Sequence, residues 1–327
     1  MRIGIDTFTI RDLKLDPYQT IDYLKNLGFE GVLYGGIRSI SENLDTGNLR
    51  DIRDYADSRD MYSYVSVSVV NPVIYKDGFD KLKERITEEI KAAAAGNWHE
   101  LHSIINVEME RYCHSVPWSM HINQCIKLIN SLRPVLEKYG SRINIETHGE
   151  TTFDVLKVIE ATGEHLTGVC LDTANMLANA EDPVLAAKRV APYTYLTHAK
   201  DGIVYFSENG ISRQGKPPGQ GNVDWEMVLS ILGKYNPDLP LSIEDHKWLS
   251  EARVFNKDWI EKNPELTPYE LGQFVKLAWK TQQKINLGEI TAVDIYEATP
   301  YLDEMEGRIV SGQKYLRELL KKLNLYQ

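Results

Sequence analysis

The chain has 327 residues, of which 43% are hydrophobic and 26% are charged, and its formal net charge is −10. This composition is typical of a globular protein with a large core, and the acidic balance argues against a nucleic-acid backbone or an anionic membrane as the main partner. The sequence has no apolar run of membrane-spanning length, no basic leader before its first strand-like segment and no CxxC pair among three cysteines, so we expect a cytoplasmic protein.

Strand-like and helix-like segments alternate along the first three quarters of the chain. The strands are expected at residues 2–9, 30–33, 64–70, 101–107, 142–147, 166–171, 193–198 and 239–244. Helices are expected at 17–27, 48–58, 80–95, 120–139, 152–162, 182–190 and 224–232. The alternation predicts a parallel sheet covered by helices, and eight such strands predict closure into a (β/α)8 TIM barrel. No GxGxxG turn follows the first strand, which disfavours an open dinucleotide-binding sheet.

The last part of the sequence has a different character. Trp248, Trp259, Phe274 and Trp279 lie among charged residues at roughly helical intervals. We therefore expect residues 1–250 to form the barrel and residues 251–327 to form a helical extension that packs on the barrel or on a partner. Residues 202–222 are expected to form a long polar loop, and loops of this length in compact folds are often functional or mobile.

Polar side chains end four of the predicted strands. The fifth strand ends in Glu146-Thr147-His148, the sixth in Asp172, the seventh in His198 and the eighth in Glu244. Residues 146, 172 and 198 are evenly spaced, 26 positions apart, which is about the length of one β/α repeat. The four side chains should therefore lie at the same level of the barrel, at the carboxyl ends of its strands, where the catalytic groups of such barrels are found.

Three carboxylates and one imidazole that converge in this way need a cation. Like charges held close together would force protonation of one or more groups, and a divalent ion removes that conflict. Oxygen and nitrogen ligands without thiolate suit Mn²⁺ or a similar ion, such as Mg²⁺ or Co²⁺, better than structural Zn²⁺. The alternative for each residue alone is structural, with Asp172 capping a helix and His198 an ordinary buried histidine.

The segments INIETH, CLDTANM, THAKD, SIED and PGQGNVDW together resemble the xylose isomerase-like TIM barrel superfamily. The resemblance covers roughly residues 1–250 and implies that Glu146, Asp172, His198 and Glu244 bind one Mn²⁺-like ion. Asn175 occupies a position at which the family often has a substrate-contacting histidine, and we expect it to bind substrate. In ketose epimerases of this superfamily, the glutamates that correspond to Glu146 and Glu244 also move protons.

The Glu-x-His arrangement of Glu146 and His148 resembles the catalytic α subunit of C-glycoside deglycosidases. That resemblance implies a lyase in which His148 removes a proton next to the ketone of a 3-oxo-glycoside, so that the aglycone leaves. It also implies a small β subunit as partner. Three alternatives stay open: a ketose or sugar isomerase or 3-epimerase, an inosose or keto-sugar dehydratase, and a barrel without catalytic activity. The role of His148 could equally be structural.

Three further residues are predicted to contact substrate, namely Lys200, Glu108 and Arg213. Lys200 and Arg213 also have a simpler interpretation as solvated loop residues. Histidines around the fourth strand, including His102, are expected to be surface or core residues.

Overall fold

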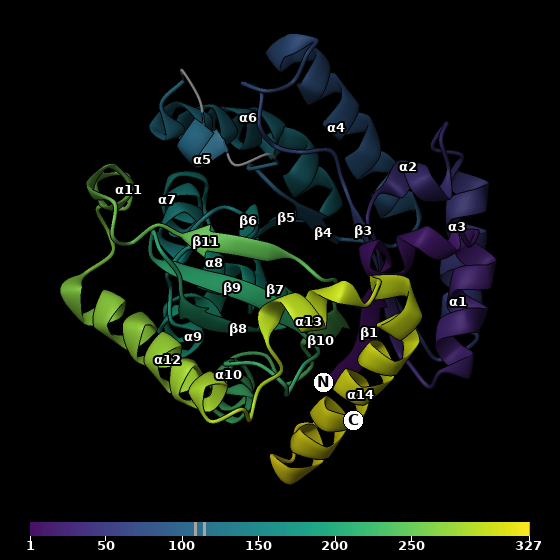
Figure 1. Ribbon diagram of the computed structural model, residues 1–327. Helices are drawn as coiled ribbons and strands as arrows, with labels where there is room; N and C mark the ends of the chain where they lie inside the picture. Colours follow the sequence, from purple (N-terminus) through teal and green to yellow (C-terminus); the bar gives the residue numbers. More distant parts are fainter. Residues whose placement is uncertain (108–109, 114–115, 327) are drawn as a thin grey trace.

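The computed structural model describes residues 1–107, 110–113 and 116–326, and it shows a closed barrel of parallel strands ringed by helices (Figure 1). Around the barrel the strands follow the order β1-β10-β7-β6-β5-β4-β3-β2, so that β1 and β10 close the ring. Their bounds are Arg2–Asp6 (β1), Gly31–Tyr34 (β2), Tyr62–Ser66 (β3), Glu100–Ser103 (β4), Arg142–Glu146 (β5), Thr167–Asp172 (β6), Thr194–Ala199 (β7) and Pro240–Ile243 (β10). The predicted TIM barrel is confirmed.

Helices that return the chain between strands cover the outside of the barrel. They are α1 (Pro17–Asn26), α3 (Thr46–Asp57), α4 (Gly78–Ala95), α6 (Trp118–Tyr139), α7 (Thr152–Thr162), α9 (Pro183–Val190) and α10 (Trp225–Leu232). Shorter helical segments are η1 (Thr7–Leu13), α2 (Ile37–Ile40), α5 (Glu110–Cys113), α8 (Asn175–Ala178) and η2 (Ala191–Tyr193). Every residue of β2, β6 and β10 is buried, as expected for strands with side chains in the interior on one face and under helices on the other. None of the described helices is long and apolar enough to cross a membrane.

The expected loop at residues 202–222 is mostly a hairpin, so this prediction was wrong. Strands β8 (Asp201–Phe206) and β9 (Ile211–Lys216) pair antiparallel, and β11 (Leu249–Ala252) adds to the edge of β9. The sequence of β9 is too polar to be recognised as a strand. Its Arg213 and Gln214 are buried because they hydrogen-bond Asn175 and Glu297, which are distant in the sequence.

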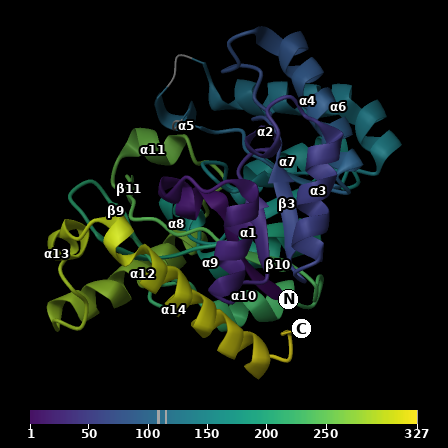
Figure 2. The same ribbon diagram turned by 90° about the vertical axis from the view of Figure 1, so that its right-hand side faces the viewer.

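The C-terminal helices are present as expected. They are α11 (Lys257–Glu261), α12 (Pro268–Asn286), α13 (Val293–Ala298) and α14 (Tyr301–Lys322). Phe274 and Ala278 of α12 pack in a second hydrophobic cluster with residues of the small sheet, such as Val204 and Ile211. Helix α14 lies beside the barrel near β1 and β10, as both views show (Figure 2). The domain boundary at residue 250 stays a prediction, and β11 crosses that position.

Two strands are shorter than the sequence suggested, and this changes the level at which some side chains lie. The strand expected at 2–9 ends at Asp6, and the strand expected at 101–107 ends at Ser103. Asp6 and His102 are therefore close to the carboxyl ends of β1 and β4 rather than inside longer strands. These ends face the same mouth of the barrel as the polar residues on β5, β6, β7 and β10.

Candidate metal centre

The four strand-end residues predicted as ligands come together at the mouth of the barrel. Glu146 and Asp172 are the last residues of β5 and β6, His198 lies near the end of β7, and Glu244 directly follows β10. One potential ligand atom from each lies within 4.8 Å of the others, and all four side chains are buried. This distance is compatible with shared coordination of one ion, so the predicted geometry is confirmed.

Several buried polar atoms of the cluster lack hydrogen bonds within the described part of the chain, and a bound cation would explain this. Asp172 Oδ2, Glu244 Oε2 and both ring nitrogens of His198 are buried without a hydrogen-bond partner among the described residues. Buried polar atoms in folded proteins nearly always have a partner. His198 Nδ1 lies 3.3 Å from Glu146 Oε1 and 3.0 Å from Glu244 Oε2. The donor set therefore fits a divalent cation.

A thiol also lies near His198. Cys170, His102 and His198 form a second group of potential ligands within 4.8 Å of one another. Burial raises the pKa of the Cys170 thiol well above its usual range, so the neutral thiol is the favoured form. The oxygen-rich group is the better cation site, because its carboxylates are ionised far more readily than this thiol.

Lys200 supplies positive charge inside the cluster. Its Nζ lies 3.4 Å from Asp172 Oδ2 and 3.2 Å from Glu244 Oε1. Burial raises the pKa of Asp172 to about 6, the charge of Lys200 opposes this rise, and Glu244 adds to it. Despite burial, His198 and the neighbouring cationic groups hold the pKa values of Glu146 and Glu244 well below their usual range, so both stay ionised and can bind a divalent ion.

Sequence reasoning missed three residues around the ligands: Asp6, His102 and His246. His102 Nε2 lies 2.9 Å from Glu146 Oε2, and His246 Nε2 lies 3.4 Å from Glu244 Oε1. Asp6 Oδ2 lies 3.5 Å from His198 Nε2. His102 is buried, as a core residue would be, and it also directly contacts the candidate ligand Glu146. A shorter β4 in the prediction would have placed it at a strand end.

His148, the predicted base, is only half-buried and lies two residues beyond the ligand Glu146. Its Nδ1 lies 2.8 Å from the carbonyl oxygen of Asn106. A carbonyl only accepts, so Nδ1 carries a proton and donates it, which leaves the lone pair of the neutral imidazole on Nε2. The contact with Asn106 thus selects the tautomer that a base needs.

Besides Lys200, two predicted substrate-binding residues are linked to the candidate ligands. Asn175 Nδ2 donates to Glu146 Oε1 at 3.3 Å, and Arg213 Nη1 donates to Asn175 Oδ1 at 3.0 Å. Both side chains are buried, so Arg213 is not the solvated loop residue of the simpler interpretation. The third such residue, Glu108, lies outside the described residues. Contact of any of them with substrate stays a prediction.

Comparisons with known proteins agree with this architecture. A family model described as the xylose isomerase-like TIM barrel matches residues 21–266, about three quarters of the chain. A curated relative, 3-oxo-isoapionate decarboxylase of Pectobacterium atrosepticum, is 28% identical over 113 residues, which are 34% of this chain and 41% of that protein. The chain thus spans less than half the length of this relative.

Solved structures resemble the whole fold at low sequence identity. A D-psicose 3-epimerase structure covers 98% of this chain and 99% of its own, with a TM-score of 0.66 and 14% identity. The 3-keto-D-glucoside 4-epimerase of Escherichia coli covers 81% and 98%, with a TM-score of 0.55 and 13% identity. At these identities the comparison establishes the fold alone.

Proposed function

The chain belongs to the xylose isomerase-like TIM barrel family, and we propose that it is a divalent-metal-dependent enzyme that removes a proton next to the ketone of an oxo-sugar. The observation that carries the proposal is the convergence of Glu146, Asp172, His198 and Glu244 within 4.8 Å of one another. The half-buried His148 beside this cluster supplies the base. The reactions named for the similar proteins, on a keto-glucoside, a ketose and an oxo acid, support a keto substrate.

Within this class we propose a lyase acting on a 3-oxo-glycoside. His148 Nε2 takes the proton from C2, and the electrons of the broken C2–H bond delocalise into the C3 ketone. The bond from C1 to the aglycone then breaks, the C1=C2 double bond forms, and the aglycone leaves with the electron pair and gains a proton. Proton transfer of this kind by a positioned imidazole contributes roughly 10²- to 10⁴-fold in rate.

Glu146, Asp172, His198 and Glu244 are the residues that would hold Mn²⁺, Mg²⁺ or Co²⁺, and the ion, when bound, would polarise the ketone and stabilise the developing negative charge. His102 orients Glu146 from one side, since its Nε2 lies 2.9 Å from that carboxylate. Lys200 holds positive charge between Asp172 and Glu244. Asn175, Arg213 and Glu108 are proposed to position the hydroxyl groups of the sugar.

One observation favours a 3-epimerase as a second candidate. Glu146 and Glu244 both lie close to His198, at 3.3 and 3.0 Å from its Nδ1. Two carboxylates that contact one bound ketose could remove a proton from one of its faces and return one to the other. In that case His148 would orient the substrate rather than act as the base.

One experiment separates these two reactions. The Mn²⁺-loaded protein is incubated in D₂O with an aryl 3-oxo-glucoside and, separately, with free ketoses. Release of the aglycone with an unsaturated keto-sugar identifies the lyase, whereas deuterium uptake with a new stereoisomer identifies the epimerase. If neither substrate class changes while the protein retains its metal, the proposed function is wrong.

The predicted small β subunit stays part of this proposal. Large apolar side chains are exposed on the C-terminal part of the chain, with exposed fractions of 62% for Phe255, 73% for Leu287 and 63% for Ile295. Exposed apolar surface of this kind supports a protein partner, although it does not identify one. Purification of the protein from its native source, followed by analysis of co-eluting chains, tests this part.

A further inference from the structure

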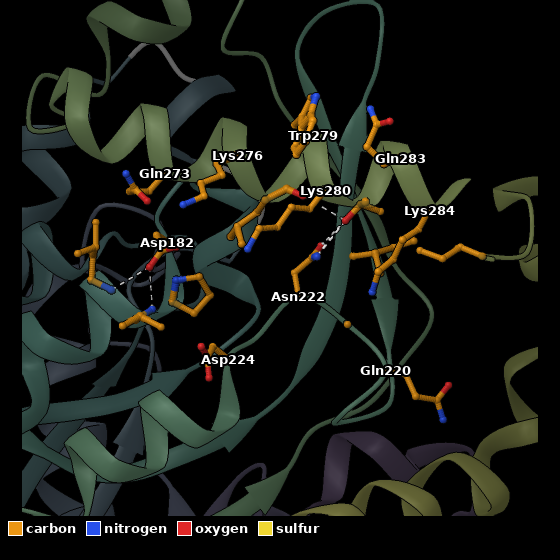
Figure 3. A pocket seen from close by; sticks show the side chains of 18 of the residues that line it. Asp182, Gln220, Asn222, Asp224, Gln273, Lys276, Trp279, Lys280, Gln283 and Lys284 are labelled. Carbon is orange, nitrogen blue, oxygen red and sulfur yellow. Dashed lines mark hydrogen bonds between the residues drawn. The ribbon is translucent and has the colours of Figure 1, made fainter. Parts of the chain in front are cut away.

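A cavity of about 790 Å³ lies outside the barrel, away from the candidate metal centre. Its walls are α12, the segment 220–222 after β9, and the beginnings of α9 and α10, as the close view shows (Figure 3). None of the four candidate metal ligands lines it. The cavity is therefore a separate feature of the surface, and the size is that of a pocket for a small molecule.

Four lysines and three acidic residues line this cavity, so its formal charge is slightly positive. Lys276, Lys280 and Lys284 follow one another at intervals of four along α12, and Lys188 joins them from α9. Residues four apart lie on the same face of a helix, so the three lysines of α12 form a row. No ion pair or hydrogen bond of these four side chains is found within the described part of the chain.

Some lysines on other helices form ion pairs, although others, such as Lys83 and Lys91 of α4, form none with any described residue. Lys81 pairs with Glu84 at 2.8 Å on α4, Lys257 with Glu261 at 3.4 Å on α11, and Lys322 of α14 with Glu226 at 2.7 Å. The row on α12 lacks such pairs although the whole chain has an excess of acidic residues, with a net charge of −10. Like charges four residues apart destabilise a helix by about 0.2–0.5 kcal/mol per pair, which a bound anion would offset.

The acidic residues of the cavity offset only part of the charge of the lysines, and none of them forms an ion pair with the row among the described residues. Asp182 accepts from the backbone N–H groups of Val184 and Leu185 as the N-cap of α9, and Asp224 accepts from Met227 N as the N-cap of α10. Their charges therefore stabilise helix N-termini. Glu289 is the remaining acid of the lining, against four lysines.

We propose that this cavity binds a small molecule with several phosphate charges, such as a diphosphate or triphosphate ester. The lysines from 276 to 284 span about 12 Å along α12, which is more than a single phosphate group can contact. Lysine ammonium groups act as point charges that suit phosphate oxygens in many orientations. Trp279, with 56% of its surface exposed, adds a flat apolar face to the same wall for the uncharged part of the ligand.

The test titrates sodium tripolyphosphate and ATP into the full-length protein by calorimetry, at low and at about 0.15 M ionic strength. We expect saturable binding to the natural protein. The triple variant Lys276→Gln, Lys280→Gln, Lys284→Gln should bind at least about tenfold more weakly. The matched control, Lys81→Gln, Lys83→Gln, Lys91→Gln on α4, carries the same change in net charge and should bind like the natural protein.

Three outcomes would overturn the proposal. Equal weakening in the α4 control would mean that net charge alone governs binding. Loss of binding in Asp172→Asn, with retention in the α12 variant, would assign the phosphates to the metal centre. Binding of a poly-glutamate peptide in place of both phosphate probes, or of no probe, would also exclude a phosphate site. Because the assay does not measure turnover, its result is independent of the proposed reaction.

Discussion

The chain concentrates charge in two regions of opposite sign and opposite exposure. At the barrel mouth three carboxylates are buried at the ends of rigid strands, and atoms of Asp172, Glu244 and His198 lack hydrogen-bond partners. In the cavity beside α12 the lysines are exposed and lie on one helix face. Buried charges are costly unless they are fully paired, so their ligand must fit precisely in position and charge, whereas exposed charges tolerate a range of anions.

The largest effect should come from removing a charge at the barrel mouth. Asp172→Asn takes away a carboxylate that no other residue replaces, and we expect loss of bound metal and a fall in activity of at least about 10³-fold, since a metal ion supplies several kcal/mol of transition-state stabilisation. Elemental analysis and the aglycone-release assay measure the two effects. Glu84→Gln, on exposed α4, is the control and should change neither; an active, metal-loaded Asp172→Asn protein would disprove the ligand assignment.

A buried charge that another residue of the chain neutralises should affect the stability of the protein rather than its activity. Arg308 of α14 donates from Nε and Nη2 to both oxygens of Asp245, at 2.6 and 2.7 Å, and both side chains are buried. Arg308→Ala leaves the Asp245 carboxylate buried alone, so we expect the free energy of unfolding to fall by about 3–5 kcal/mol in denaturant titrations. Arg317→Ala, on a different and more exposed face of α14, should cost less than about 1 kcal/mol. Equal costs for the two variants would contradict the distinction between buried and exposed charge.

A substitution of His148 tests whether catalysis at the barrel mouth needs a base besides the four candidate metal ligands. His148→Gln should lower aglycone release by about 10²- to 10⁴-fold and leave metal content unchanged, because the imidazole moves a proton and is not one of the four ligands. His165→Gln, on an exposed side chain, is the matched control. Full lyase activity in His148→Gln would transfer the role of base to another group and favour the glutamates.

The smallest expected effect concerns Asp201, a buried carboxylate that accepts hydrogen bonds from N–H groups. Asp201 accepts from Gly219 N, Val223 N and Trp225 Nε1, and burial raises its pKa to about 6 despite these donors. A folded-state pKa above the unfolded value means that Asp201 contributes stability below about pH 4 and loses it as the pH rises through 6. Between about pH 4 and pH 6, the natural protein should therefore lose free energy of unfolding relative to Asp201→Asn. A difference independent of pH would show that Asp201 does not titrate there.

The barrel and the convergence of the four strand-end side chains could be predicted because both depend on short-range patterns. Each strand carries its own run of apolar residues, and Glu146, Asp172 and His198 recur at the interval of one β/α unit. Closure of the sheet then brings residues at equal levels together without further information.

The features that could not be predicted depend on contacts between distant segments. β9 is polar in sequence, and Arg213 is buried only because Asn175 accepts its hydrogen bond from another part of the chain. The row of lysines on α12 is visible as a spacing of four, but the cavity exists only because α12 docks against the segment around Asn222, whose side chain hydrogen-bonds Thr281 at 2.9 Å (Figure 3).

The pairing that closes the barrel has a consequence for how the chain is made. β1 pairs with β10 through Arg2 and Pro240, and Tyr301 of α14 donates to Asp245 O at 2.7 Å beside this seam. During synthesis the free edge of β1 must wait for β10, which ends at Ile243, about three quarters of the way along the chain. Folding by such non-local contacts is slow, and an unpaired strand edge is prone to aggregation in the meantime. Chaperone demand should therefore be greatest in the interval before the eighth barrel strand emerges.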